Sequence, residues 1–571
     1  MVDRGLRGDS LDLTLESIRE FAARHLGDAS LLAFDAADEM PLDLVRAMCG
    51  AELGLQLLFV PEEFGGVGAG AFDVYRVCEL MAGIDLGIAT GVLATSLGSD
   101  PIRIGGSPEQ KTRWLGRVAQ EGLLVAYAAT EPEAGSDLPA LRTVATPIQE
   151  ADRTVGYSIS GRKQWISNGG VADLYCVLAL APQGPSWFIV ERDAPGLGHG
   201  KREEKHGIRA SNTAAVFLDK VRVDVDCLIG GVEGQGLAQA QAVFGYTRLM
   251  VAAFGLGGGW NALDRAIRYS RERSVSGGPL AEKQGYTHKL IVPHAVRLEA
   301  ARAFTEEVAA RLDEGEGNLN TEGAIAKLVA TEAANLAADA ALQALGGYGY
   351  VREYMVEKLR RDVRITTIYE GTSEIMEMTI ARDRWQTHLK TRGDHYHEQG
   401  RVLDRLAVLK PGCGAEIAAL ALHALAEVME QCRTQRLTRS QHVLLRLGEM
   451  IAQAECCASL TRRAAAATSG TIHPKAVTRF EPSALAAMAR VFARETALQV
   501  GEAGIRLVIG AGAEAIASTL ASALNLSRIH SAQAGLLADM DRVGDALYAR
   551  AVDRPVQPGL PLEVGTAGGR T

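Results

Sequence analysis

The sequence predicts a mainly helical protein with a β domain in its middle, in the order α, β, α, followed by a further helical domain. Residues 123–232 contain short, partly alternating, β-rich segments such as GYSISGRKQWISN and SWFIVERD, separated by Gly, Pro, Asn and Asp. On both sides of this stretch the apolar residues recur at helical spacing. The 571 residues are also too many for one hydrophobic core, which favours several domains.

The predicted regions follow one another along the chain. Residues 1–122 form a helical domain, in which the pattern from Thr14 to Leu26 predicts an amphipathic helix that stops at Gly27. Residues 123–232 form the β domain, and residues 233–385 form long helices that include the Ala-rich run from Glu322 to Leu345. A polar linker, QTHLKTRGDHYHEQG, is expected after Trp385, followed by a helical extension in the rest of residues 386–555 and a flexible tail at residues 556–571.

Composition excludes several classes of protein. A 47% hydrophobic and 23% charged chain is typical of an ordered globular protein, and its net charge of −9 without a basic arm argues against a nucleic-acid partner. The eight cysteines are scattered without a CxxC pair or a His cluster, so we expect reduced, mostly buried thiols and no metal site. No signal-peptide core and no run of about 18 apolar residues is present, which predicts a cytoplasmic protein.

One carboxylate stands out as a candidate base. Glu370 lies between the aromatic Tyr369 and Gly371, which lacks a Cβ and lets a ligand approach the backbone. Thr372 is a suitable cap for the helix that follows. Taken alone, a Glu before a Gly is more often the end of a loop, and only further motifs favour the functional interpretation.

Five motifs supply that context. They are YAATEPEAGSD (127–137), RKQWISNGG (162–170), the segment 273–284, QALGGYGY (343–350) and IYEGTSEI (368–375). In this order they resemble the acyl-CoA dehydrogenase family over residues 10–385, and the resemblance implies that family's α/β/α three-domain core. The extension is similar to that of the very-long-chain members in position, length and helical character.

The resemblance implies FAD as the cofactor and assigns residues to it. Tyr127 and Thr130 would flank the flavin, Trp165 would stack on it, and Ser167 would donate its hydroxyl to flavin N5. The remaining implied contacts are Arg273 and Gln284 to the diphosphate and adenine end of the partner subunit's FAD, Gln343, Gly346 and Gly347 to the adenosine diphosphate portion, and Thr372 and Glu374 to the flavin.

The resemblance also implies the substrate site. Glu370 matches the catalytic base, and because the second position known in the family is occupied here by Thr247, the chain carries one candidate. Ser136 would reach the CoA moiety, Phe244 and Arg248 would line the substrate, and Gly371 would lie against it. Four residues depart from the common pattern: Glu133, Gly245, Ser276 and Glu374.

The implied function is α,β-dehydrogenation of an acyl-CoA to a trans-2-enoyl-CoA, as in the β-oxidation of fatty acids. Glu370 would remove the α proton with a pKa raised by a dry pocket, flavin N5 would take the β hydride, and an electron-transferring flavoprotein would accept the electrons. The extension favours long or bulky acyl groups and a homodimer over a tetramer, while chain length and branching stay open.

Other functions are also compatible with these motifs. An acyl-CoA oxidase would share the base and most cofactor contacts. An alkylation-response flavoprotein is expected to have a strongly basic extension, whereas residues 391–571 carry 20 Lys/Arg against 17 Asp/Glu. The helical face with Leu444, Leu447 and Ile451 suits peripheral membrane contact, but packing inside its own bundle is favoured.

Overall fold

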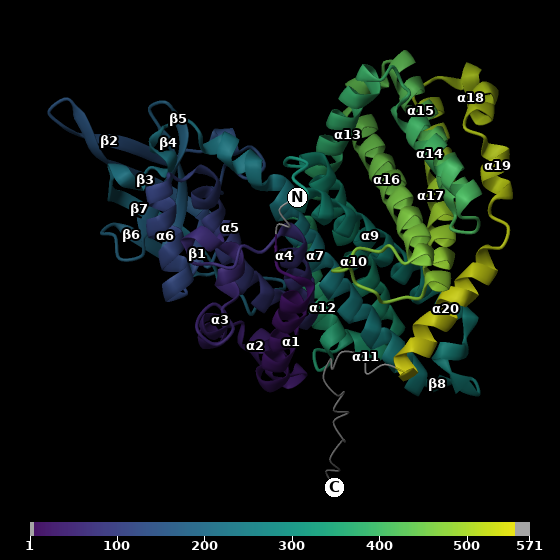
Figure 1. Cartoon of the computed structure of the whole chain (residues 1–571), viewed down its shortest axis with the longest axis horizontal. Coiled ribbons are helices and arrows are strands. Elements are labelled where there is room, and N and C mark those ends of the chain that lie inside the picture. The colour runs from purple at the N-terminus through teal and green to yellow at the C-terminus, as the bar shows by residue number, and fades with distance from the viewer. Residues whose placement is uncertain (1–4, 554–571) are drawn as a thin grey trace, which may run out of the picture.

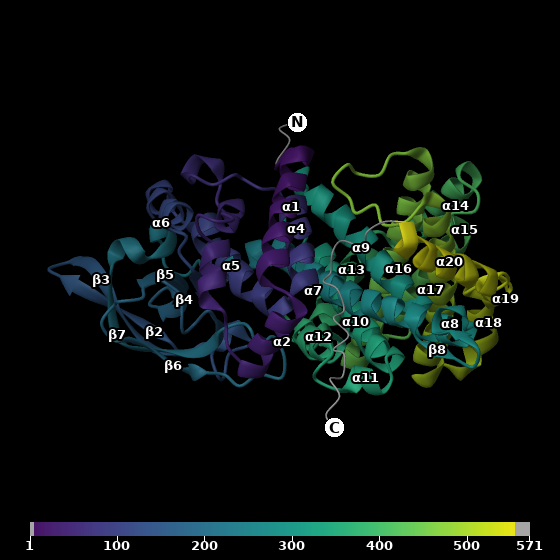
Figure 2. The same ribbon diagram turned by 90° about the horizontal axis from the view of Figure 1, so that it is seen from below.

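A computed structural model describes residues 5–553, without the side chains at position 243 and after Tyr548. It confirms the predicted fold class, a mainly helical chain with one β region (Figure 1). The β region and the helical extension lie at opposite ends of the molecule, and the long helices of the third region lie between them (Figures 1 and 2). The predicted tail at residues 556–571 lies outside the described residues.

The first region contains six α-helices, of which the first five share one hydrophobic core and the sixth packs into the core of the sheet. Two of them begin at caps that the sequence supplies. The Asp85 carboxylate accepts the Ile88 N–H at the start of α5, and Ser107 and Gln110 form a reciprocal capping box at α6. The helices are α1 (Gly8–His25), α2 (Asp28–Ala37), α3 (Leu42–Met48), α4 (Ala71–Ile84), α5 (Leu86–Gly105) and α6 (Pro108–Glu121).

The β region is one sheet in the order β1-β4-β2-β3-β7-β6, with β5 paired to β4. Strand β4 is apolar along almost its whole length because both of its faces are buried. Trp114 of α6 joins the core formed by Leu178 and Trp187 of the sheet. The strands are β1 (Val125–Ala128), β2 (Val144–Glu150), β3 (Arg153–Ser167), β4 (Leu174–Ala181), β5 (Gly184–Glu191), β6 (Leu197–Arg202) and β7 (Thr213–Asp224).

The third region is built around one long helix, α7 (Gly236–Glu272), which packs along α10 (Asn320–Ala344). Their close approach explains Gly245, because a Cβ there would lie 1.7 Å from the carbonyl oxygen of Asn318. The remaining elements are the hairpin β8 (Ser274–Val275) and β9 (Gly278–Pro279), α8 (Gln284–Leu290), α9 (Val292–Asp313), α11 (Gly347–Tyr350), α12 (Met355–Val363) and α13 (Ser373–Lys390).

A buried ion cluster joins the first and third regions. The Lys358 ammonium of α12 donates to Asp85 at the cap of α5 and, at 2.6 Å, to Asp362 one turn along its own helix. All three side chains are fully buried. Asp362 also accepts the Ile208 N–H at 2.6 Å, so the cluster anchors the loop before β7 as well.

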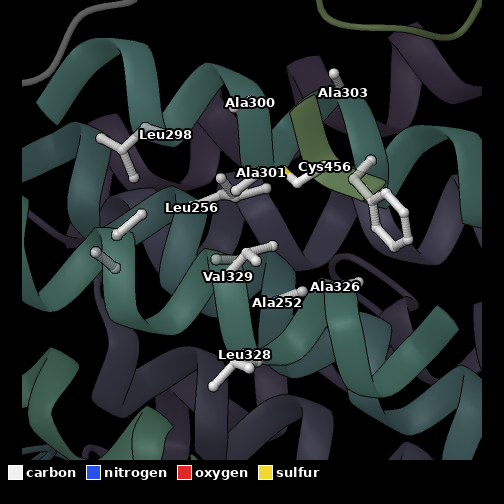
Figure 3. Close-up of a cluster of buried hydrophobic side chains, with 14 of the residues drawn as sticks. Ala252, Leu256, Leu298, Ala300, Ala301, Ala303, Ala326, Leu328, Val329 and Cys456 are labelled. Carbon is white, nitrogen blue, oxygen red and sulfur yellow. The ribbon is translucent and has the colours of Figure 1, made fainter. Parts of the chain in front are cut away.

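The extension consists of helices that continue the core of the third region. Figure 3 shows Cys456 of α16 beside Leu256 of α7, Ala301 of α9 and Val329 of α10. Leu447 and Ile451 are fully buried, so the expectation that this face packs inside the bundle is confirmed. The helices are α14 (His395–Leu409), α15 (Ala415–Thr434), α16 (Gln441–Ser469), α17 (Pro482–Gly510), α18 (Ala517–Ala523), α19 (Leu526–Ser531) and α20 (Leu536–Asp553).

The predicted linker after Trp385 is wrong. Helix α13 runs on to Lys390, and α14 starts at His395 after a short turn. The polar residues of this stretch have partners far away in the sequence. Tyr396 is fully buried and donates its hydroxyl to Glu455 at 2.7 Å, and Arg384 donates to the same carboxylate at 2.6 Å. These contacts hold the stretch as ordered helix.

The described residues bear on two expectations, one about membrane-spanning helices and one about the cysteines. Between residues 5 and 553, no helix is both long enough and apolar enough to cross a membrane. All eight cysteines are free thiols, and seven of them are buried.

Candidate functional site

Glu370 lies in a tight turn that is stabilised by contacts with a distant segment of the chain. The turn joins a 3-10 segment (Arg364–Thr367) to α13, and both Glu370 (φ 53°) and Gly371 (φ 92°) are left-handed. This conformation is natural for Gly but costs roughly 1–2 kcal/mol for a residue with a Cβ. Thr372 caps α13 as predicted, accepting the Ile375 N–H at 3.4 Å. The turn aims the Glu370 side chain and its backbone N–H in fixed directions.

A buried lysine stabilises this turn by a hydrogen bond to its backbone. Lys327 of α10 is fully buried and donates from Nζ to the Gly371 carbonyl oxygen at 2.6 Å. Burial lowers the pKa of Lys327 to about 8, against the opposing effect of Glu370 and Glu332. The same helix supplies Glu332, which accepts the Ser373 hydroxyl at 2.5 Å. Helix α10 therefore binds the end of the turn at two places, Gly371 and Ser373.

The electrostatics of the site raise the pKa of the Glu370 carboxyl group above its ordinary value. Burial raises the pKa of Glu370, and the Arg248 and Lys327 cations oppose that rise. The buried Asp100 raises it further, while the Thr247 hydroxyl lowers it. Thr247 thus lies beside Glu370.

The first two predicted flavin motifs meet in the β region. The Gln164 N–H of β3 donates to the Thr130 carbonyl oxygen at 2.9 Å. Next to this contact, Lys163 is fully buried and donates to Glu131 at 2.7 Å and to the Ala129 carbonyl at 3.0 Å. The loop after β1 is therefore fixed to strand β3 by a buried ion pair.

The Trp165 side chain has the exposure expected of a binding surface. It is 60% exposed, in a left-handed backbone position (φ 56°), although its neighbour Ile166 is buried. Ser167 ends β3 opposite Thr213, and Tyr127 of β1 packs against the Trp187 ring at 4.7 Å between centroids. An exposed indole beside two anchored loops can stack on a planar ring.

The predicted substrate residues have different environments. Arg248 of α7 is buried, donates to the Asn320 carbonyl at 3.1 Å and lies over the Phe244 ring at 4.9 Å. Ser136 is exposed in the loop after β1. Arg248 therefore lies beside both the Phe244 ring and the Glu370 carboxyl group.

Most of the residues predicted to bind the adenosine diphosphate portion of FAD line a cavity of about 590 Å³, away from the Glu370 site. Arg273, Gln343, Gly346 and Gly347 all line it, together with four tyrosines: Tyr269, Tyr286, Tyr348 and Tyr354. Gln284 does not line this cavity, and its amide donates to Asp541 of α20 at 3.1 Å. Lys327 and Gln343 are about 24 Å apart along α10, at 1.5 Å per residue, so the cavity is distinct from the Glu370 site.

Three residues of the Glu370 site escaped sequence reasoning: Lys327, Asp100 and Tyr369. Lys327 carries a visible signal, because it is the one charge in the apolar run AIAKLVA of a buried helix. Asp100 is paired with Arg103 at 2.7 Å on α5 and leaves its other oxygen without a partner among the described residues. The Tyr369 hydroxyl is likewise buried without a geometrically defined partner there.

Comparison with known proteins decides the family. Models of the N-terminal, middle and C-terminal domains of acyl-CoA dehydrogenases match residues 9–122, 126–221 and 234–384. The chain belongs to the acyl-CoA dehydrogenase family. The prediction that it is an enzyme of this oxidoreductase family is thereby confirmed.

Individual relatives agree with this assignment. The chain is 38% identical over 373 residues to an acyl-CoA dehydrogenase of Bacillus subtilis (strain 168), which spans 64% of this chain and 95% of that protein. It is 35% identical to a cyclohexane-1-carbonyl-CoA dehydrogenase of Geobacter metallireducens, over 66% of this chain and 97% of that one. A crystal structure of a Bacillus anthracis acyl-CoA dehydrogenase complexed with FAD shares the fold with a TM-score of 0.80 over 95% of both chains, at 22% identity. That fold match includes the extension.

Proposed function

We propose that this protein is an FAD-dependent acyl-CoA dehydrogenase in which Glu370 removes the α proton of an acyl-CoA thioester. The observation that carries the proposal is the environment of Glu370. Its carboxyl group has a pKa raised by burial, lies beside the Arg248 and Lys327 cations, and sits on a turn held against its conformational preference. Such groups are typical of active-site bases.

The residues present fit FAD at both of its ends. Trp165 presents an exposed indole next to the anchored Thr130 loop, which suits a planar isoalloxazine. In the 590 Å³ cavity, Arg273 has no ion pair among the described residues, and a Cβ at Gly346 or Gly347 would meet no atom within 4 Å. A free guanidinium and open glycine backbone suit a diphosphate. When bound, FAD supplies the hydride acceptor.

The residues of the chain itself have separate roles in the reaction. Glu370 accepts the proton from the α carbon, which is acidified by the neighbouring thioester carbonyl. The Glu370 N–H donates to no acceptor within the described part of the chain, so it can donate to that carbonyl oxygen as charge develops there. Lys327 keeps this N–H and the carboxylate in place through the Gly371 carbonyl.

The product is a trans-2-enoyl-CoA, and we propose an electron-transferring flavoprotein as the electron acceptor. An oxidase would use the same base, and its turnover in air would release hydrogen peroxide. Peroxide in step with enoyl-CoA would therefore refute the proposed acceptor while leaving the role of Glu370 intact. The cofactor residues on two distant surfaces of one chain favour a homodimer, in which each subunit completes the partner's site.

The central test is anaerobic bleaching of the flavin by a panel of acyl-CoAs, including straight-chain, branched and cyclohexane-carbonyl thioesters. Glu370→Gln keeps the size of the side chain but cannot accept the α proton. We expect its flavin reduction to be slower by a factor of about 10² to 10⁴, the usual contribution of a general base. Glu314→Gln, in an exposed turn, is the matched control. Equal reduction rates for Glu370→Gln and wild type contradict the proposal.

A further inference from the structure

The last described helix of the extension, α20, contacts α7 and α8, the two helices that flank the β8–β9 hairpin next to Arg273. In Figure 1 the end of α20 lies near the end of α7 and the β8 hairpin, far from the start of the extension, and α20 contacts both α7 and α8. The hairpin connects the end of α7 to the start of α8, and its residues from Ser274 to Gly277 are exposed. Its tip therefore has little packing of its own.

At the α7 end, Tyr548 of α20 makes the contact. The Ser270 hydroxyl, which is fully buried, donates to the Ile267 carbonyl at 2.8 Å. It therefore accepts from the Tyr548 hydroxyl, 2.9 Å away. The Arg271 guanidinium donates to the Tyr548 carbonyl and lies 5.7 Å from the centre of the Tyr548 ring.

At the α8 end, Asp541 of α20 makes the contact. Its Oδ1 accepts the Gln284 amide at 3.1 Å and lies 3.1 Å from His288 Nε2, without the alignment of a hydrogen bond to the imidazole. Between these two residues, Tyr286 lines the cavity and donates its hydroxyl to the Ala344 carbonyl at 3.3 Å. The element that Asp541 holds is thus a wall of the cavity.

We propose that α20 is a positioning element for the nucleotide half of the cofactor site, through Tyr548 and Asp541. By fixing both ends of the hairpin, it sets the place of Arg273 and of the Tyr286 wall. The resemblance assigned Gln284 directly to the adenine end, whereas here its amide is held by the extension. This inference rests on the proposed function, because it takes the cavity to receive the adenosine diphosphate portion of FAD.

The helix itself is anchored independently of these contacts. Asp539 accepts two ion pairs from Arg490 and Arg494 of α17, and Val543 is fully buried. Truncating α20 would disturb this packing, so point variants are the better perturbation. Asp541→Ala with Tyr548→Phe removes the two side-chain contacts, and Asp545→Ala, exposed on the same helix, is the matched control.

The test compares FAD with riboflavin, which lacks the adenosine diphosphate portion. Apo-protein is titrated with each by flavin fluorescence, and amide hydrogen exchange is followed over residues 273–283. We expect the double variant to bind FAD about tenfold more weakly, the size of one to two hydrogen bonds, with unchanged riboflavin affinity and faster hairpin exchange. Asp541→Asn, which keeps the acceptor oxygen, should restore most of the Asp541 contribution.

The outcomes are separable. Unchanged FAD affinity together with unchanged hairpin exchange overturns the positioning role. An equal loss for FAD and riboflavin also overturns it, because it shows a general loss of structure. If wild-type protein binds no FAD, the proposed function fails, while hairpin exchange alone still decides whether α20 fixes the hairpin.

Discussion

Replacing Lys327 by Met tests whether the turn that carries Glu370 is held by a buried charge. Met has a similar length and is apolar, so it fills the space of the lysine stem but leaves the Gly371 carbonyl without its donor at 2.6 Å. A hydrogen bond to a charged group contributes about 1.5–3 kcal/mol. The left-handed backbone conformation of Glu370 is itself unfavourable. We therefore expect the loss of this hydrogen bond to displace the Glu370 carboxyl group.

If the whole loss reaches the transition state, kcat/KM falls about 10- to 150-fold, at 1.36 kcal/mol per factor of ten. The pH profile should change in two ways. Removing the cation raises the pKa of Glu370, which moves the acidic limb of the profile to higher pH. The wild type should also lose activity near pH 8 as Lys327 deprotonates, and the Met variant should lack that limb.

Steady-state kinetics from pH 5 to 10 with a fixed acyl-CoA measure both effects. Lys390→Met, exposed at the far end of α13, is the control, and Lys327→Arg tests whether charge alone suffices. If Lys327→Met keeps the wild-type kcat/KM and both limbs of the profile, the turn needs no support from Lys327 and the reasoning is refuted.

Three further predictions concern stability. Gly245→Ala places a Cβ against the Asn318 carbonyl and should lower the melting temperature, whereas Gly510→Ala, with open space, should not. Lys358→Met leaves two buried aspartates without their cation and should cost about 3–5 kcal/mol in urea unfolding; a loss below 1 kcal/mol would contradict the buried-pair argument. Burial raises the pKa of Glu377 to about 7, so the folded state binds more protons than the unfolded state above the ordinary carboxyl pKa. Wild-type stability should therefore fall as pH rises from about 5 to 7 relative to Glu377→Gln, and parallel curves would show that the shift is absent.

Local patterns in the sequence were enough to predict the fold class and some local features around Glu370. Period-2 and helical spacing located the sheet and the long helices, because these patterns reflect which faces are buried. The motif around Glu370 predicted the cap at Thr372 and a raised pKa, both of which the structure bears out. These features depend on neighbours in the chain or on burial of a whole segment.

Contacts between distant segments could not be predicted in this way. The stretch after Trp385 is polar, which is typical of a linker, yet Tyr396 finds a partner in Glu455, far along the chain. Lys327 and Gly371 are likewise separated by 44 positions. A buried charge is recognisable in an apolar run, but its partner is defined only by the packing of α10 against the turn.

The helical extension is packed directly against the third region. Its helix α16 shares a hydrophobic core with α9, with α7, which carries Arg248, and with α10, which carries Lys327 (Figure 3). A core shared in this way transmits small displacements, because packed interiors leave few voids to absorb them. Perturbations of α16 should therefore reach the Glu370 turn through α10, whereas perturbations of the exposed Asp541 contact should stay at the nucleotide cavity. We therefore expect the extension to influence the two halves of the site by different means, one through packing and the other through the hydrogen bonds of Tyr548 and Asp541.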